Sequence, residues 1–473
     1  MSPYRRRGAV PVALIASAAL VLTACSGGGD GDDRATDDGG GGAGEGLTVW
    51  SLENLPDRMQ VTQGIVDAFT EETGIEVELV GIDEGQAPQL VQSGAIGGEL
   101  PDVMGALSLA YVRQFDDQEL IDVDANAAVV EALGADTWEE SALELTRDGD
   151  RQLSVPSDAW TQILVYRTDL FEAEGLEPPD TYESLEAAAE ALTKDGMFGI
   201  TLATDPADVF TSQTFESLAL GNNCQLVDDG GNATLDSPEC LATWELYQAL
   251  AQDYSPSGTQ TVDSTRATYF AGQAAMTMWS TFLLDELAGL RNDALPACPE
   301  CADDPGFLAE NTGIVSSVAG PDGEGASYGE VTSWTVMDGA ATEEAQQFIE
   351  YMLSTGYLDW LDMAPEGKFP VRVGNEEDPT AYTDGWAELE AGVDTFAPLS
   401  EIYDEATMEQ ITSVAERVDR WAIPQGQGAI LGPTITELPI SQAVAEMGAG
   451  SLDAAGAAER AQAAVEEIAA GVG

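Results

Sequence analysis

The sequence predicts an α/β fold, because its first folded stretch alternates between strand and helix patterns. The short apolar strand Leu47–Trp50 is followed by a helix pattern with one apolar face, which ends at Gly74. Residues 75–80 then alternate as a second strand, residues 86–96 have a helical composition, and residues 101–104 are a short apolar strand. Strand, helix, strand, helix, strand indicates a parallel sheet with right-handed crossovers.

Strand and helix patterns also alternate in the rest of the chain, without an internal repeat. Asp148–Asp150 is a turn signal, and Asp180 with Glu183 matches a capping box ahead of an apolar-faced helix. The other expected strands are 153–156, 163–167, 198–202 and 275–279, and the other expected helices are 185–192, 209–220, 240–250, 265–270, 342–353, 356–363 and 452–470. A region of this length has room for two domains.

The N-terminus has the pattern of an export signal. Arg5–Arg7 precede an apolar run that ends at Ala24, which is short for a membrane-spanning helix. The ending Leu22–Cys25 resembles a bacterial lipobox, in which cleavage precedes the cysteine and the thiol is acylated, for example with palmitate. We therefore expect residues 1–24 to be a lipoprotein signal peptide. The alternative is an ordinary cleaved signal followed by an unrelated cysteine.

The segment after the signal is expected to be a tether. Residues 25–46 begin with the lipidated Cys25 and contain almost only Gly, Asp, Ala, Ser, Thr and Glu. Such a composition buries too little apolar surface to offset the entropy of ordering. We expect residues 25–46 to be disordered and the folded part to begin near Leu47.

The chain is strongly acidic, with 85 Asp and Glu against 17 Lys and Arg, no histidine, and a formal net charge of −68. Nucleic-acid binding needs a basic surface, so this composition excludes it, and it disfavours a polyanionic ligand. The lack of histidine excludes a histidine-based triad or zinc site. Because the acids are spread along the chain, we expect an acidic surface suited to a saline medium, where salt screens self-repulsion.

Four cysteines follow Cys25, and an even number in an exported protein indicates disulfides. We expect Cys224 to pair with Cys240 and Cys298 with Cys301. The alternatives for the second pair are a redox motif and a metal knuckle, although it lies in a Pro- and Asp-rich loop rather than at a helix start. The acidic turn at residues 227–234 lacks EF-hand spacing. We therefore expect no metal and no other cofactor.

Several sequence blocks, taken in order behind the lipobox, resemble one protein family. They are 47–50 with 69–77, 100–103, 154–156 with 164–171, 270–278, and 341–349. The chain resembles the extracellular solute-binding proteins of ABC importers, in the group similar to maltose-binding protein that takes up sugars and oligosaccharides. The resemblance covers most of residues 47–470.

The resemblance implies a two-lobed α/β fold of the periplasmic-binding-protein type, with a ligand cleft between the lobes. Lobe one is expected at residues 47–153 and 312–369, and lobe two at residues 154–311 and 370–473. The implied protein is a monomer and not an enzyme. It captures a sugar or oligosaccharide by hinge closure and delivers it to an ABC permease. Its implied place is the extracytoplasmic face of the cell membrane, held by a lipid anchor.

A sugar cleft needs aromatic rings for the apolar ring faces and polar side chains for the hydroxyl groups. We expect the aromatic contacts near lobe crossings and strand ends, at Trp160, Trp279, Phe282 and Trp334. We expect the polar contacts beside these rings, at the carboxyl ends of strands, or where scarce cations occur, at Glu53, Asn54, Ser108, Asp158, Asp205, Ser280, Glu330, Ser333, Lys368 and Arg372. The alternatives are the hydrophobic core for each aromatic and the solvated surface for each polar residue.

Two other functions stay open at this point. A cationic ligand such as a polyamine, or a peptide, would suit an acidic aromatic cleft, and two or more carboxylates around the rings would favour it. A secreted glycoside hydrolase would need two carboxylates flanking the scissile bond. No motif marks such a pair among so many acids.

Overall fold

The structure, a computed structural model, describes residues 46–472. The predicted signal peptide at 1–24, the lipidated Cys25 and the predicted tether lie outside the described residues, apart from Gly46 at the end of that tether. In the described part of the chain, no helix has both the length and the apolar composition needed to cross a bilayer.

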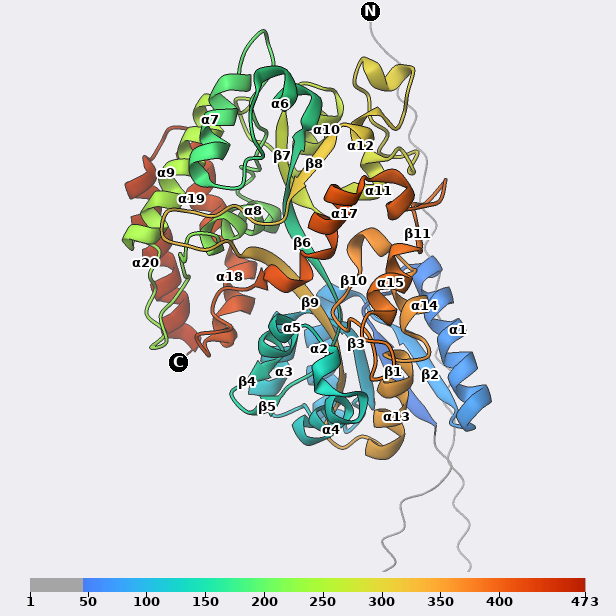
Figure 1. The fold of residues 1–473 in the computed structure, drawn as a ribbon. Coiled ribbons are helices and arrows are strands. Elements are labelled where there is room, and N and C mark those ends of the chain that lie inside the picture. Colours follow the sequence, from blue (N-terminus) through green and yellow to red (C-terminus); the bar gives the residue numbers. More distant parts are fainter. Residues whose placement is uncertain (1–45, 473) are drawn as a thin grey trace, which may run out of the picture. The chain divides into compact units, whose positions relative to one another are not determined.

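The predicted α/β alternation is present, and its first strands form the predicted parallel sheet. The main sheet has the order β10-β6-β9-β3-β1-β2, with β1 parallel to both β2 and β3 (Figure 1). The strands are β1 Leu47–Ser51, β2 Val77–Gly81, β3 Val103–Leu107, β4 Arg147–Asp148, β5 Arg151–Gln152, β6 Val155–Arg167, β7 Met276–Ser280, β8 Thr312–Val315, β9 Ser327–Val336, β10 Phe369–Pro370, β11 Glu390–Ala391, β12 Ala397–Pro398 and β13 Val418–Asp419.

The strand β6 connects two groups of strands. Its first half pairs antiparallel with β9, from Val155 to Thr161, and its second half pairs antiparallel with β7 and β8 (Figure 1). The sequence predicted two separate runs here, at 153–156 and 163–167. The polar residues between them do not interrupt the strand, because Asp158 is buried and accepts hydrogen bonds from Ser157 and Trp360.

Residues with known helix-start and helix-stop preferences mark the ends of several helices. Helix α1 starts at Pro56 and is followed by Gly74 at φ 79°, a left-handed conformation that favours glycine. The predicted capping box at Asp180 and Glu183 is instead formed by Thr181 and Ser184. The helices are α1 Pro56–Thr73, α2 Ala87–Gly97, α3 Leu109–Asp117, α4 Val123–Leu133, α5 Glu140–Leu145, α6 Thr168–Glu174, α7 Tyr182–Leu192, α8 Val209–Leu220, α9 Pro238–Asp253, α10 Val262–Phe270, α11 Leu283–Leu287, α12 Phe307–Glu310, α13 Thr342–Met352, α14 Tyr357–Leu361, α15 Ala381–Ala387, α16 Leu399–Ile402, α17 Glu405–Thr412, α18 Leu431–Glu437, α19 Pro439–Gly448 and α20 Ala454–Val472, with short 3₁₀ turns that include η1 Glu84–Gln86, η4 Pro365–Gly367 and η6 Gly428–Ile430.

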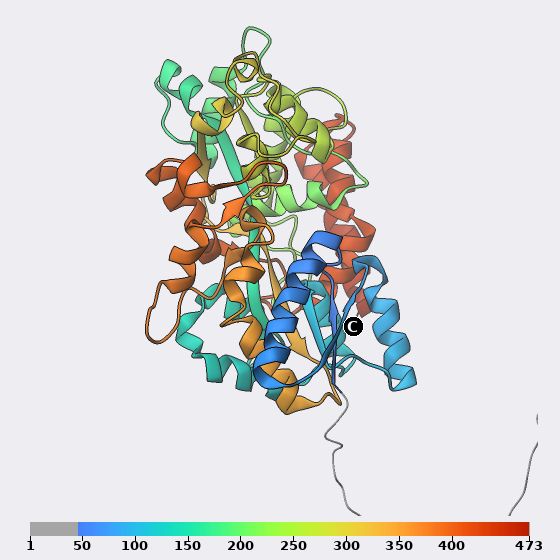
Figure 2. The same ribbon diagram turned by 90° about the vertical axis from the view of Figure 1, so that its right-hand side faces the viewer.

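The C-terminal helices pack against the middle of the chain. Helix α20 contacts α9 and α19, and α19 contacts α8. Small side chains on α20 allow this approach, since Ala457, Ala458 and Ala461 are fully buried. Figure 2 shows these red helices alongside the green ones. The strand predicted at 198–202 is absent from the described fold, where Phe198 and Thr201 make only isolated bridges to Ala274 and Thr277.

The structure brings the four cysteines together in the expected pairs. The Sγ atoms of Cys224 and Cys240 are 2.08 Å apart, and those of Cys298 and Cys301 are 1.91 Å apart. Among residues 46–472, no group of three or more His, Cys, Asp or Glu side chains is arranged to hold a metal ion.

The carboxyl groups of Asp285 and Glu366 are both buried in the folded protein. Asp285, in α11, is 0% exposed, and neither of its carboxylate oxygens has a hydrogen-bond partner in the described structure. Burial, together with the charge of Glu366, raises the pKa of Asp285 to about 8. Asp285 therefore keeps its proton near neutral pH in the folded protein.

We predict that Asp285 lowers the stability of the folded state as pH rises. Its folded pKa of about 8 exceeds the ordinary 3.8 of an aspartic acid. The stabilising contribution is therefore complete below about pH 4 and is lost as pH rises to about 8. Asp285→Asn, which stays neutral, should gain stability relative to the wild type between pH 5 and pH 9.

Urea unfolding at the two pH values measures this difference. The exposed Asp303→Asn is the matched control, and its free energy of unfolding should follow the wild type at both pH values. Parallel pH profiles for the wild type and Asp285→Asn would contradict the prediction.

Candidate functional site

A cavity of about 1000 Å³ lies against β6, β9, α3 and α8. Its size is at the upper end of the range found for small-molecule sites. We call this cavity the cleft. The residues that line it are Leu52, Glu53, Asn54, Leu55, Arg58, Glu84, Gly85, Pro88, Ala106, Ser108, Ala110, Tyr111, Gln114, Asp117, Asp158, Trp160, Val209, Gln213, Phe282, Tyr328, Glu330, Thr332, Gly367, Lys368, Ala429, Gly432, Pro433, Ile435, Thr436 and Glu437.

An aromatic wall forms one side of the cleft. The half-buried indole of Trp160 lies 5.6 Å from the ring of Tyr328 and 6.2 Å from the ring of Phe282, measured between centroids. Phe282 packs directly on Gly367, where a Cβ atom would be only 1.9 Å from its ring. The planes of Phe282 and Tyr328 are tilted by 57° and 56° from that of Trp160, so the rings form an angled apolar surface that can pack against the C–H face of a ligand.

A buried lysine holds the acids at one end of the cleft. Lys368 is 2% exposed, and its Nζ lies 2.6 Å from Glu53 Oε1 and 3.4 Å from Asp158 Oδ2. Arg58 donates to the other oxygen of Glu53 at 2.7 Å. Burial alone would raise the pKa of Glu53, but the charges of Lys368 and Arg58 outweigh it and lower the pKa to about 2. Glu53 is therefore ionised and fixed in place.

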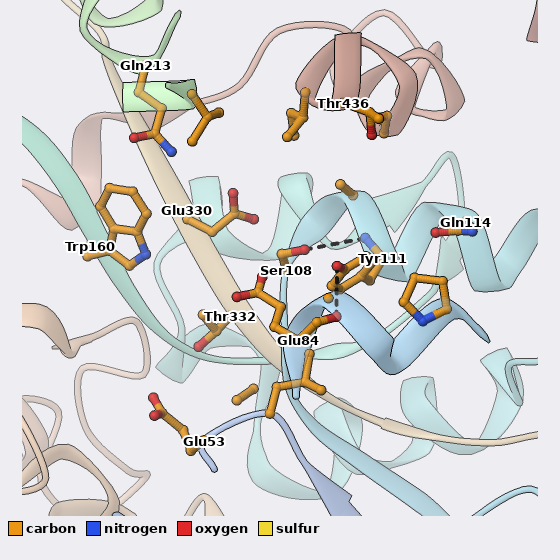
Figure 3. A pocket seen from close by; sticks show the side chains of 18 of the residues that line it. Glu53, Glu84, Ser108, Tyr111, Gln114, Trp160, Gln213, Glu330, Thr332 and Thr436 are labelled. Carbon is orange, nitrogen blue, oxygen red and sulfur yellow. Dashed lines mark hydrogen bonds between the residues drawn. The ribbon is translucent and has the colours of Figure 1, made fainter. Parts of the chain in front are cut away.

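A second buried cation, Arg420, holds Glu330 from below. Its Nη1 donates to Glu330 Oε2, while Glu330 Oε1 accepts from the backbone N–H of Leu109 at 2.7 Å. Tyr328 Oη donates to Glu330 Oε2 at 3.5 Å. Figure 3 shows Glu330 between Trp160 and the pair Ser108 and Tyr111. Glu330 thus presents a fixed acceptor beside the aromatic wall.

The remaining acids make the cleft electrostatically negative. Burial raises the pKa of Glu84, and the charges of Glu330, Glu53 and Asp83 raise it further. Tyr111 donates a hydrogen bond to the backbone carbonyl of Glu84 at 3.0 Å, and not to the side-chain carboxylate of Glu84 (Figure 3). The two cations that line the cleft, Arg58 and Lys368, already contact carboxylates.

The structure brings eight of the expected contacts together in the cleft. They are Glu53, Asn54, Ser108, Asp158, Trp160, Phe282, Glu330 and Lys368. Tyr328 and Thr332 also line it and were not among the expected contacts. They flank Glu330 at two-residue spacing on β9, so strand alternation could have identified both. No such signal marks the other unexpected lining residues, such as Glu84, Gln213, Ile435 and Thr436.

Two aromatic candidates lie in the core instead of the cleft. Trp334 is fully buried, and its ring lies 5.1 Å from that of Trp360. It occupies the space beside Gly105, where a Cβ atom would be 2.3 Å from the indole. Trp279 is buried against Phe210 at 5.6 Å, and its Nε1 donates to the backbone carbonyl of Val262.

Four polar candidates also lie away from the cleft. Ser333 is fully buried and Ser280 nearly so. Asp205 accepts from the backbone N–H of Ala207 in its own loop. Arg372 is buried and donates to Thr137 Oγ1, Tyr382 Oη and the backbone carbonyls of Leu133 and Leu353. The guanidinium of Arg372 therefore links these segments by hydrogen bonds and does not line the cleft.

Comparisons with known proteins agree with this architecture. YcjN of Escherichia coli K12, a candidate periplasmic-binding protein of an ABC transporter, is 29% identical over 324 residues, covering 67% of this chain and 70% of YcjN. The cyclic α-maltosyl-1,6-maltose binding protein from Arthrobacter globiformis has a TM-score of 0.66 at 20% identity, covering 90% of this chain and 99% of that one. The sugar-binding protein MalE from Xanthomonas citri has a TM-score of 0.70 at 16% identity, covering 90% and 98%.

These likenesses confirm the predicted fold class, the two-lobed α/β fold of periplasmic binding proteins. The model of one family, described as bacterial extracellular solute-binding protein, matches residues 64–426, which is most of the chain. This match confirms the resemblance that the sequence blocks indicated. The chain belongs to the family of bacterial extracellular solute-binding proteins.

Proposed function

We propose that this protein captures a sugar or oligosaccharide in the cleft and delivers it to the permease of an ABC importer. The observation that carries the proposal is an aromatic wall, Trp160 with Tyr328 and Phe282, beside the fixed acceptors Glu53 and Glu330. Rings suit the C–H faces of a sugar, and ionised carboxylates accept from its hydroxyl groups. Two structurally similar proteins support the same ligand class, because their names describe one as a cyclic α-maltosyl-1,6-maltose binding protein and the other as a sugar-binding protein.

Capture works by closure of two lobes, residues 47–153 with 312–369 and residues 154–311 with 370–473. The strands β6 and β9 lie under the cleft, and side chains from α3 and α8 line it. A ligand that touches both helices stabilises the arrangement in which they are close, and this shifts the population toward the closed state. The acceptors are already held by Lys368 and Arg420, so little ordering is needed on binding. The ligand leaves chemically unchanged.

The protein works as a lipid-anchored monomer outside the cytoplasm. The lipobox at Leu22–Cys25 supports an acylated Cys25, and residues 25–46 serve as the tether. An oxidising compartment suits disulfides at Cys224–Cys240 and Cys298–Cys301, whose sulfur atoms are adjacent.

A cationic ligand, such as an amine-bearing sugar or a polyamine, is the second candidate. Carboxylates of Glu53, Glu84 and Glu330 gather around the aromatic wall, and acids beside aromatic faces favour ammonium groups. Glu84 is the informative residue, because no cation is bonded to its carboxylate in the described structure.

Replacing Trp160 tests the proposed function. Trp160→Leu should weaken binding of the sugar that the wild type selects by at least about 10-fold, or roughly 1.4 kcal/mol, through loss of the stacking surface. A thermal-shift panel of mono- and oligosaccharides in high salt identifies that sugar, and calorimetry gives Kd. Trp279→Leu, in the core, is the matched control and should lower Tm while leaving Kd unchanged.

Two outcomes would contradict the proposed function. One is a folded wild type that binds no sugar in the panel. The other is a bound sugar recovered as shorter products by chromatography, which would support the glycoside hydrolase instead.

Replacing Glu84 separates the two candidate ligand classes. For a cationic ligand, Glu84→Gln should weaken binding by about 3–10-fold, and added salt should weaken it further, because the attraction is between charges. Binding of a neutral sugar should stay the same. Glu71→Gln, on the exposed face of α1, is the control for net charge. A wild type that binds a neutral sugar more tightly than its amine counterpart would exclude the second candidate.

Mass spectrometry of the exported protein tests the anchor. We expect a chain that begins at Cys25, carries acyl chains on it, and has a mass lower by four hydrogens, as two disulfides require. Cys25→Ser should release the protein from the membrane into the medium. An unmodified Cys25 in a membrane-free protein would show an ordinary cleaved signal.

A further inference from the structure

The C-terminal part of the chain places a cation directly beneath the cleft. The short strand β13 (Val418–Asp419) pairs in parallel with the start of β9, with Val418 opposite Ser327 and Asp419 opposite Tyr328. The next residue, Arg420, is 1% exposed. It is not among the residues that line the cleft. It lines a small adjoining pocket, which shares Val209, Gln213, Tyr328 and Ile435 with the cleft.

Arg420 contacts two cleft residues from their buried side. Its guanidinium donates to Glu330 and lies 4.6 Å from the ring centroid of Tyr328. Burial would lower the pKa of Arg420, but the neighbouring Tyr328, Glu330 and Glu216 outweigh it and raise the pKa. The guanidinium is thus charged and held by its neighbours. It fixes one acceptor and one ring of the aromatic wall at the same time.

The contacts of Arg420 continue into the helices on both sides of the cleft. Its Nε donates to Glu216 of α8 at 3.2 Å, and Glu216 also accepts from the backbone N–H of Trp421 at 2.9 Å. On the other side, Glu330 accepts from the backbone N–H of Leu109, the first residue of α3. Both helices supply cleft residues, including Gln213 of α8 and Tyr111 of α3. One chain of hydrogen bonds therefore links α8, Arg420, Glu330 and α3.

We propose that Arg420 is a positioning residue of the cleft, which holds Glu330 and Tyr328 in their ligand-binding orientation from the buried side. The inference depends on the proposed function, because it takes the cleft as the ligand site. The planar fork of an arginine contacts two carboxylates at once, which a lysine cannot do with the same geometry. Loss of this link would leave Glu216 and Glu330 buried without their shared cation.

Two substitutions of Arg420 test the inference, with the sugar that the wild type selects as the probe. Arg420→Gln should raise Kd by about 10-fold or more, and Arg420→Lys should restore part of that loss, because it returns the charge without the fork. The matched control is Arg167→Gln. Arg167 is also buried and bonds to Asp169 at 2.7 and 2.6 Å, outside the cleft. This control should lower Tm and leave Kd unchanged.

The outcomes separate the inference from the proposed function. If the wild type binds the sugar and folded Arg420→Gln binds it equally well, the inference alone is overturned. Equal losses of affinity in Arg420→Gln and Arg167→Gln also overturn it, because they would reflect general destabilisation. If Arg420→Gln does not fold, Arg420→Lys decides the question, with a loss of about 3-fold or more supporting the inference and an unchanged Kd overturning it. A wild type that binds no sugar overturns the proposed function itself, and this inference with it.

Discussion

The antiparallel pairing of β6 with β9 is the contact on which the cleft depends. Its register places Trp160 opposite Glu330 and Asp158 opposite Thr332. All four side chains line the cleft, so one pairing sets the aromatic wall beside its polar acceptors. Because side chains alternate along a strand, a slip of one residue would turn one strand's members of this set away from the cavity. Both strands are almost wholly buried, which keeps the register fixed.

The cleft also uses cations that are scarce in this chain. With 17 basic residues against 85 acids, most acids can be stable only on a solvated surface. Two cations are buried here, Lys368 in the lining of the cleft and Arg420 beneath it, and each contacts two carboxylates. A buried ion pair repays its desolvation cost only with good geometry, so its net effect on stability is small. Its effect on orientation is larger, because Lys368 and Arg420 hold the carboxylates of Glu53 and Glu330 in place.

Trp160 and Trp334 illustrate how far the sequence alone could identify the site. Both tryptophans lie in strands next to polar residues, and the sequence gives each similar reasons to face a ligand. Gly105 on the neighbouring strand β3 leaves the space that Trp334 fills, whereas Trp160 is half-buried among the other cleft rings. The difference lies in which glycine faces which ring, and a single sequence does not contain that information. The sequence likewise does not show that Arg372 is buried away from the cleft, where it donates hydrogen bonds to the backbone carbonyls of Leu133 and Leu353.

The sequence by itself determined the α/β alternation, most helix positions, the cysteine pairing and the family resemblance. These follow from short-range chemistry, namely apolar periodicity, caps, glycine stops and residue composition. The tertiary structure decided which side chains meet in the cleft. Glu84, Gln213, Tyr328 and Thr436 come from segments far apart in the chain, and only strand register and helix packing bring them together. The tertiary structure also decided that β6 is one strand. Its buried Asp158 accepts hydrogen bonds from Trp360 and Lys368, which lie about two hundred residues away in the chain.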